Sequence, residues 1–582
     1  MARNGPGRRS YEGVGVGQSG AVRSLTLEVR CSGDTVKGAK ARRKPGVGNP
    51  VPGTILGVLV EGPKTPKTGR RERFVKNVLW SWTGVAVSLL TGLWLSPFII
   101  KKLGDEGYGV WALVFSFVEY YWLLDFGFRS ATVKYSAHYR ATGENDKVNE
   151  VINTGLAYTG VAACLLISVT LVFAGRVQHF FQISGTYRPV FNTLVVMVGC
   201  TFALGTVFSL CSGVVEGYQR FDLTTRVWIT TTALRTMGLV AVLLMGFRLK
   251  AMAMVAIASL AAGYAYNYRN LRAVFPSLNL SFSGINASMF RRMFRYGIHT
   301  SVATISTLVL NQNTPLILAH FLPTAFVGYF LLPTRLLRYS VDMVCKVGYV
   351  TGSNAAEMAA RREYDQVYRM GVYVNRYCYV LFAPAALALC LYGTELLRVW
   401  VNPEFALHSG PVVSVIAVGT TLGIAAQYNS SSVLYGLGRH QLFAYSLLAE
   451  AILSSAAAWV VIPRYGIVGA AWVVAVFMVA NRGLLTSWLF CRGVERSFGA
   501  YVRGVYLRPT LAAIPALLVA WVIKVRWLPG RNWVQVLGGM ALVATIYYAA
   551  AYFICLEKEH RSIPKRWIEE RLGRRPTLRS TP

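Results

Sequence analysis

Charged residues, and acidic ones above all, are scarce in this chain of 582 residues. Only 15% of its residues are charged, whereas about 25% is usual in a soluble protein. The 26 Asp and Glu are outnumbered by 60 Lys and Arg, while 54% of all residues are apolar. This balance excludes most soluble enzymes and also histone-like or ribosomal polypeptides. It indicates a membrane protein with many spans whose basic residues lie in loops and tails.

The sequence also lacks the motifs of several kinds of site. Its nine cysteines lie mostly inside apolar runs, and no CxxC motif or Cys/His cluster occurs, so neither a zinc site nor a disulfide framework is indicated. No DxD motif occurs, and the acidic pair Asp105-Glu106 stands alone in a predicted turn. We therefore expect no chemical step and no bound cofactor, with H⁺ or Na⁺ as the candidate coupling ion.

Both ends of the chain are predicted to be basic tails. Residues 1–73 are rich in Gly, Pro, Lys and Arg and show no lasting apolar periodicity, which predicts a disordered segment. A tail that touches anionic lipid headgroups and an over-extended start site account for this segment equally well. Residues 556–582 form a second basic tail.

The middle of the chain is predicted to cross the membrane about 14 times. A spanning helix needs about 20 apolar residues, and only helices satisfy their own backbone hydrogen bonds in lipid. The fold class is therefore an all-α polytopic membrane protein. Loops after even-numbered spans carry more Lys and Arg than loops after odd-numbered spans, which predicts that both termini are cytoplasmic. The basic cluster at 524–531 goes against this topology.

An internal repeat organises the spans. The segments that begin at Phe74 and Phe294, about 220 residues apart, follow the same order: a long span, a short loop, and a Gly-Tyr step that opens a charged span. The Gly-Tyr steps are Gly107-Tyr108 and Gly328-Tyr329, and each charged span holds an acid and a base at helical spacing, Asp125…Arg129 and Asp342…Lys346.

The repeat predicts two lobes of six spans each. Its copies are separated by an even number of spans, so they keep the same orientation and are related by an axis along the membrane normal. We predict an N-lobe at residues 74–280, a C-lobe at 281–495 and two extra helices at 496–555.

The segment from Leu103 to Val151, LGDEGYGVWALVFSFVEYYWLLDFGFRSATVKYSAHYRATGENDKVNEV, carries a family resemblance. It resembles the N-terminal signature of the bacterial polysaccharide transporters, the Wzx-type flippases of the multidrug/oligosaccharidyl-lipid/polysaccharide exporter (MOP) superfamily. The resemblance covers about residues 74–490. It implies an alternating-access transporter in the bacterial plasma membrane that moves polyprenyl-diphosphate-linked oligosaccharide to the outer leaflet. Polysaccharide polymerases and glycosyltransferases are the implied partners, and no nucleic acid is expected.

Charged residues within the predicted spans are the candidate site. A charge at bilayer depth costs about 3 kcal/mol or more and usually faces a cavity or a partner. Arginine binds a diphosphate through paired hydrogen bonds, so a cavity with a surplus of basic residues suits that group. The candidate diphosphate-binding residues are Arg335, Arg338, Lys346, Arg129, Arg235 and Arg376. The candidate ion-coupling residues are Asp125, Asp342, Glu119 and the isolated acid Glu450.

Purely structural roles for these charges stay open. Asp342 and Asp125 are also compatible with pairs in which an acid and its basic neighbours only neutralise one another. Arg129 is equally compatible with an interfacial anchor, and Arg235 and Arg376 with side chains that snorkel. The alternative functions are a peptidoglycan-precursor flippase, a multidrug or cation antiporter of the same superfamily, and a membrane glycosyltransferase or polymerase.

Overall fold

The structure, a computed structural model, describes residues 68–425, 428–527 and 529–557, and these residues are almost entirely helical. The predicted tails therefore lie largely outside the described residues. The longer elements are α2 (Thr68–Val118), α3 (Phe128–Thr142), α4 (Asn145–Phe180), α5 (Arg188–Gly217), α6 (Phe221–Leu244), α7 (Leu249–Val274), α8 (Ala287–Phe321), α9 (Ala325–Ala360), α10 (Tyr364–Trp400), α11 (Pro403–Thr420), α12 (Tyr428–Gly436), α13 (His440–Phe477), α14 (Thr486–Gly493), α15 (Phe498–Val502), α16 (Arg508–Arg526) and α17 (Trp533–Ile554). Short 3₁₀-helical and π-helical segments join some of them. Of these, η1 (Glu119–Asp125) and η4 (Met478–Leu485) matter for the site.

The all-α class is confirmed, but the count of about 14 spans is not. Among the described residues, nine helices are long and apolar enough to cross a membrane, or ten if the bent pair around η1 is one span. Helices α2 and α13 each join two predicted spans across a glycine with positive φ, Gly104 and Gly466. Helices α8 and α9 are as long as the others, but polar residues in α8 and charges in α9 make them less apolar.

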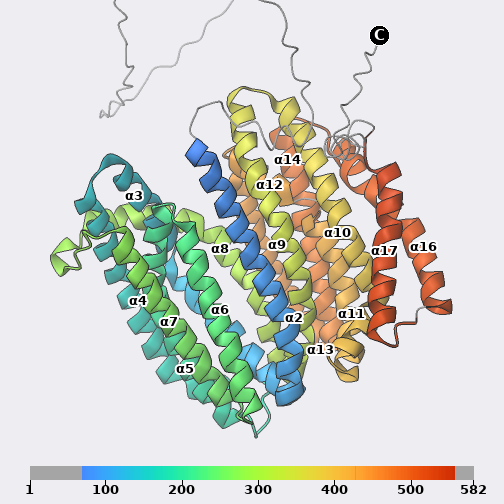
Figure 1. The fold of residues 1–582 in the computed structure, drawn as a ribbon, viewed down its shortest axis with the longest axis horizontal. Helices are drawn as coiled ribbons and strands as arrows, with labels where there is room; N and C mark the ends of the chain where they lie inside the picture. Colours follow the sequence, from blue (N-terminus) through green and yellow to red (C-terminus); the bar gives the residue numbers. More distant parts are fainter. Residues whose placement is uncertain (1–67, 426–427, 528, 558–582) are drawn as a thin grey trace, which may run out of the picture. The chain divides into compact units, whose positions relative to one another are not determined.

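Within each half of the chain, helices that are near in sequence pack against one another (Figure 1). Helix α5 packs against α4 and α7, and α6 packs against α7. In the second half α10 packs against α11, and the hairpin of α16 and α17 packs against α10. Helices α2 and α9, which hold the two Gly-Tyr steps, contact each other directly. The boundaries of the predicted lobes stay a prediction.

The two Gly-Tyr steps meet where α2 contacts α9. A Cβ atom added to Gly109 would lie 2.0 Å from the carbonyl oxygen of Thr324, and one added to Gly328 would lie 2.9 Å from the ring of Tyr108. Glycine at both places lets the helix backbones approach closely. Each tyrosine also reaches the other copy of the repeat: the Tyr329 hydroxyl donates to Asp105 at 2.8 Å, and the Tyr108 hydroxyl accepts from Arg335 at 3.4 Å.

The first copy of the repeat is broken at the point where the second is continuous. After α2 the chain forms the 3₁₀ helix η1, and then Phe126 (φ 39°) and Gly127 (φ 72°) take left-handed conformations before α3 begins. Helix α9 runs without such a break from Ala325 to Ala360. The predicted helical spacing of Asp125 and Arg129 is therefore wrong, because the left-handed residues lie between them. The corresponding spacing in α9 is retained.

The close contact of α2 with α9 makes a prediction about Gly109. Gly109→Ala places a methyl group against the Thr324 carbonyl, so the helices must separate, and overpacking of this kind costs about 1–3 kcal/mol. We expect a lower apparent unfolding temperature for the detergent-purified protein. Gly160→Ala in α4 is the control, because a Cβ there meets nothing within 4 Å. Equal midpoints for the two variants would contradict the close contact.

Candidate functional site

Two arginines of α9 face one carboxylate, and a third arginine, from α6, lies near them. Arg335 and Arg338 of α9 both interact electrostatically with Glu119, the first residue of η1. Arg235 of α6 lies close enough to Arg335 for the two charges to repel. Gln312 of α8 donates a hydrogen bond to the Glu119 carboxylate. We call these five residues the arginine cluster; they come from elements of both predicted lobes.

The cations of the arginine cluster are not fully compensated. Among the described side chains, the ion pairs include none at Arg235, Arg335 or Arg338. Glu119 is the acid that Arg335 and Arg338 face, and Asp342 lies one turn beyond Arg338 on α9. Asp342 is half-buried and has an interaction of its own. Even with this second acid, three guanidinium groups stand against two carboxylates. The side chain of Lys346 lies outside the described residues.

Arg129 is held away from the arginine cluster by another acid. Its guanidinium forms an ion pair of 2.7 Å with Glu216 of α5 and contacts the Ser212 hydroxyl at 3.5 Å. Its backbone N–H donates to the Asp125 carboxylate at 3.3 Å. The structure thus gives Arg129 a partner that its sequence spacing did not indicate, and it uses Asp125 to cap the start of α3.

Arg376 belongs to a contact between α10 and the C-terminal hairpin. Its side chain is buried, donates to the Gly504 carbonyl at 2.6 Å and pairs with Glu557 at 3.3 Å. A buried guanidinium that donates to a carbonyl and pairs with a carboxylate in this way stabilises helix packing. Of the six predicted diphosphate-binding residues, the structure therefore brings together Arg235, Arg335 and Arg338 and places Arg129 and Arg376 elsewhere.

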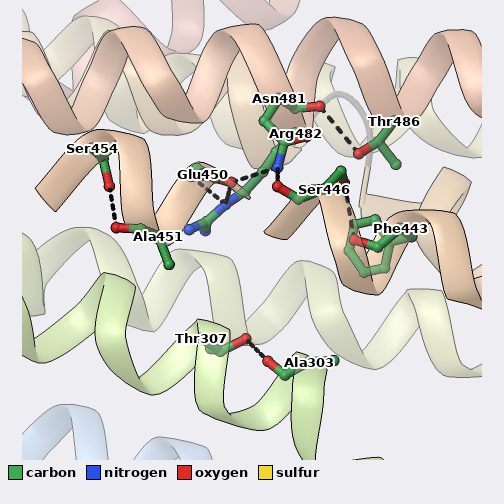
Figure 2. A network of polar contacts seen from close by, with 10 residues as sticks. All are labelled: Ala303, Thr307, Phe443, Ser446, Glu450, Ala451, Ser454, Asn481, Arg482 and Thr486. Carbon is green, nitrogen blue, oxygen red and sulfur yellow. Dashed lines mark hydrogen bonds and ion pairs between the residues drawn. The ribbon is translucent and has the colours of Figure 1, made fainter. Parts of the chain in front are cut away.

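The prediction that Glu450 is an isolated acid is wrong. The Glu450 carboxylate, on α13, accepts from Arg482 Nε at 3.0 Å and from Asn481 Nδ2 at 2.7 Å, both on the π-helical turn η4 (Figure 2). Asn481 also donates to the Ser446 carbonyl at 3.1 Å, which ties η4 to α13. A π turn shifts the register of the helix and points Arg482 inward, which a regular 3.6-residue period does not anticipate.

The basic cluster that opposed the predicted topology is also partly neutralised. Lys524 of α16 forms an ion pair of 2.8 Å with Glu395 of α10 and donates to the Leu391 carbonyl. A paired lysine that faces another helix is a weaker determinant of orientation than one free in a loop. The charge-bearing partners missed from the sequence, Glu216, Glu395, Arg482 and Glu557, all lie far along the chain from the residues they neutralise, and sequence spacing gives no signal for such pairs.

Comparisons with known proteins bear on the family of this chain. Residues 74–344 match the family model described as "Polysaccharide biosynthesis protein". A "Putative O-antigen transporter" of Shigella flexneri is 21% identical over 429 residues, which cover 72% of this chain and 98% of that protein. These matches confirm the resemblance to polysaccharide transporters that the sequence indicates.

Solved structures show which fold this is. The lipid II flippase MurJ, in an inward closed conformation, aligns with a TM-score of 0.62 at 11% identity, over 85% of this chain and 99% of that one. An inward-facing multidrug resistance MATE family transporter of the MOP superfamily aligns with a TM-score of 0.58 at 13% identity, over 72% of this chain and 96% of that one. This chain therefore shares its fold with these two transporters.

The pair of Glu450 and Arg482 makes a prediction about stability. Glu450→Leu leaves a largely buried guanidinium without its carboxylate, and breaking a buried pair costs about 3–5 kcal/mol. We expect a marked fall in the apparent unfolding temperature of Glu450→Leu and a smaller fall in the double variant Glu450→Leu/Arg482→Met, which removes both charges. If the double variant loses as much stability as Glu450→Leu and Arg482→Met lose separately when added together, the two side chains do not interact.

Proposed function

We propose, from this fold and this family resemblance, that the protein flips polyprenyl-diphosphate-linked oligosaccharide from the cytoplasmic to the outer leaflet by alternating access. It would act in the bacterial plasma membrane with both termini cytoplasmic and would supply a polysaccharide polymerase on the outer side. The transported headgroup is changed in position only, so no bond is made or broken. The arginine cluster carries this proposal.

The chemistry of the arginine cluster suits a diphosphate. A guanidinium presents paired donors that match two phosphate oxygens, and such charge-assisted hydrogen bonds are about twice as strong as neutral ones. Arg335 and Arg338 stand one turn apart on α9, so both can engage one diphosphate. The interactions of Glu119 with Gln312 and with the arginines of α9 support a site between elements of both predicted lobes. Rocking of the lobes would therefore change the access of a bound headgroup.

Two alternatives within the superfamily differ in the substrate. A peptidoglycan precursor also carries a polyprenyl diphosphate, and the MurJ fold covers most of this chain, so the arginine cluster by itself serves both lipids. The polysaccharide substrate is favoured by the match of residues 74–344 and by the O-antigen relative. A multidrug substrate is disfavoured, because three guanidinium groups repel an organic cation.

Glu119 offers a way to couple transport to an ion. In the empty protein its carboxylate compensates Arg335 and Arg338, so a bound diphosphate must compete with it for the same guanidinium groups. Protonation of Glu119 would remove that competitor and strengthen substrate binding, and release of the proton would weaken it. We therefore assign proton coupling to Glu119 ahead of Asp125, which caps α3, and Glu450, which is neutralised by Arg482.

The proposed function predicts the result of removing both arginines of α9. Hydrogen bonds to charged groups contribute about 1.5–3 kcal/mol each, so Arg335→Ala/Arg338→Ala should weaken binding of undecaprenyl diphosphate by at least about 100-fold. Flipping of the sugar-linked lipid in proteoliposomes should be lost. Arg335→Lys/Arg338→Lys keeps the charge but not the paired donors, and we expect an intermediate loss.

The matched control for this experiment is Arg291→Ala/Arg295→Ala. These two arginines are also exposed and about one turn apart on one helix, but they lie near the start of α8, away from the arginine cluster. Binding by this control should stay near the wild-type value. Wild-type flipping by the Arg335/Arg338 double Ala variant would refute the site assignment.

Glu119→Gln tests the proposed coupling, because glutamine imitates the protonated acid. Binding of the sugar-linked lipid by the wild type should tighten as the pH falls, since protonation frees Arg335 and Arg338. Glu119→Gln should bind tightly at every pH, and its flipping should no longer respond to an imposed pH gradient. Glu357→Gln, an exposed acid paired with Arg361, is the control and should keep the wild-type pH response. A pH response that survives in Glu119→Gln would exclude Glu119 as the coupling group.

A further inference from the structure

The 3₁₀ helix η1 connects the arginine cluster to a second feature. A 3₁₀ helix has three residues per turn, so side chains three apart are eclipsed on one face. Glu119, Trp122 and Asp125 are spaced in this way, and the first of them lies in the arginine cluster. With a rise of about 2 Å per residue, Asp125 lies about 12 Å farther along the same face. A pocket opens at that end.

The pocket has a volume of about 570 Å³ and combines aromatic rings with polar groups. Trp122, Phe208 and Tyr264 contribute rings, the last two stacked on each other with centroids 5.0 Å apart. Asp125 and Asn267 contribute polar side chains from η1 and α7. The Oδ1 atom of Asn267 is buried and has no hydrogen-bond partner among the described residues.

The serines of this pocket present acceptors. The hydroxyl hydrogen of Ser209 is donated to the Thr206 carbonyl at 2.7 Å, and that of Ser212 to the Ser209 carbonyl at 2.7 Å. The Ser301 hydroxyl likewise donates to the Gly297 carbonyl at 2.9 Å. Their remaining lone pairs, with Asp125 and Asn267 Oδ1, make a wall that accepts hydrogen bonds. A ligand that fits it brings several O–H donors and a face that stacks on an aromatic ring.

We infer that this pocket binds the first sugars of the transported headgroup, while the arginine cluster binds the diphosphate to which they are attached. The inference rests on the proposed function and adds to it a separate glycan subsite. Sugar hydroxyls supply the donors that the wall lacks, and the C–H face of a pyranose ring packs on an indole. The eclipsed face of η1 sets the direction in which the headgroup lies, from Glu119 past Trp122 to Asp125.

Other ligands fit the pocket less well. A second anion would meet Asp125 and a row of acceptors, and Arg129 on the pocket wall is already paired with Glu216. An organic cation would find the rings and Asp125 attractive, but it would lie about 12 Å from three guanidinium groups. A neutral polyhydroxylated ligand satisfies the acceptors without either charge conflict.

Trp122→Ala and Asn267→Leu test the subsite by comparing lipids that differ only in the sugar. The probes are undecaprenyl diphosphate without a sugar and the same lipid carrying one glucose, galactose or N-acetylglucosamine. We expect at least one sugar-bearing probe to bind the wild type more tightly than the bare lipid. Each variant should bind the sugar-bearing probe roughly five- to tenfold more weakly than the wild type does. Its affinity for the bare lipid should stay unchanged.

Neither substitution should unfold the protein, so a loss of binding can be attributed to the pocket. Trp122 is 38% exposed, and the Asn267→Leu change replaces a buried oxygen that has no partner among the described residues by an apolar group of similar size. Trp122→Phe keeps a ring and should restore most of the gain. Trp228→Ala is the matched control, since Trp228 is 40% exposed on α6 and does not line the pocket.

The outcomes separate this inference from the proposed function. If no sugar-bearing probe binds more tightly than the bare lipid, or if the gain persists in both pocket variants, the glycan subsite is refuted and the diphosphate site stands. If the bare lipid does not bind, or binds equally to the Arg335/Arg338 double Ala variant, the proposed function fails and the subsite fails with it. Ethidium binding that is lost in Trp122→Ala would assign the pocket to organic cations instead.

Discussion

A charge inside hydrocarbon must be compensated, and the manner of compensation divides the intramembrane charges of this protein into two kinds. Arg129, Arg376, Arg482 and Lys524 each meet a carboxylate from a distant part of the chain, so they hold separate segments together. Arg335 and Arg338 instead face Glu119, and Arg235 lies close to Arg335. Even with Asp342 counted, three guanidinium groups stand against two carboxylates. In the proposed function, the surplus cation of the arginine cluster would bind the substrate, whereas the paired charges hold helices together.

The asymmetry between the two copies of the repeat supports the same division. The second copy keeps α9 continuous, which places Arg335 and Arg338 on one face. The first copy breaks at Phe126 and Gly127, which opens the pocket at the end of η1. An exact repeat would have duplicated one kind of site. In the proposed function, the break would give the two copies different tasks, one for the charged part of a headgroup and one for its neutral part.

The contact between the two Gly-Tyr steps links the two copies of the repeat at the arginine cluster. Tyr108 accepts from Arg335 of the second copy, and Tyr329 donates to Asp105 of the first, which also accepts from Asn402 at 3.0 Å. The hydroxyl of the equivalent tyrosine therefore contacts a basic residue in one copy and an acidic residue in the other. Movement of α9 against α2 must disturb these contacts, so the arginine cluster is coupled to the packing of the repeat.

The sequence by itself determined the class of the protein: apolar runs, basic loops and a repeated Gly-Tyr step require a helical membrane fold, and the steps of three and four residues in α9 place Arg335 and Arg338 on one stripe. It did not determine which charges are paired, because Glu216, Glu395, Arg482 and Glu557 come from distant segments. Sequence spacing also predicts a regular period where η1 and η4 depart from 3.6 residues per turn. Only the tertiary structure decides these points, since long-range partners and helix irregularities arise from packing between helices.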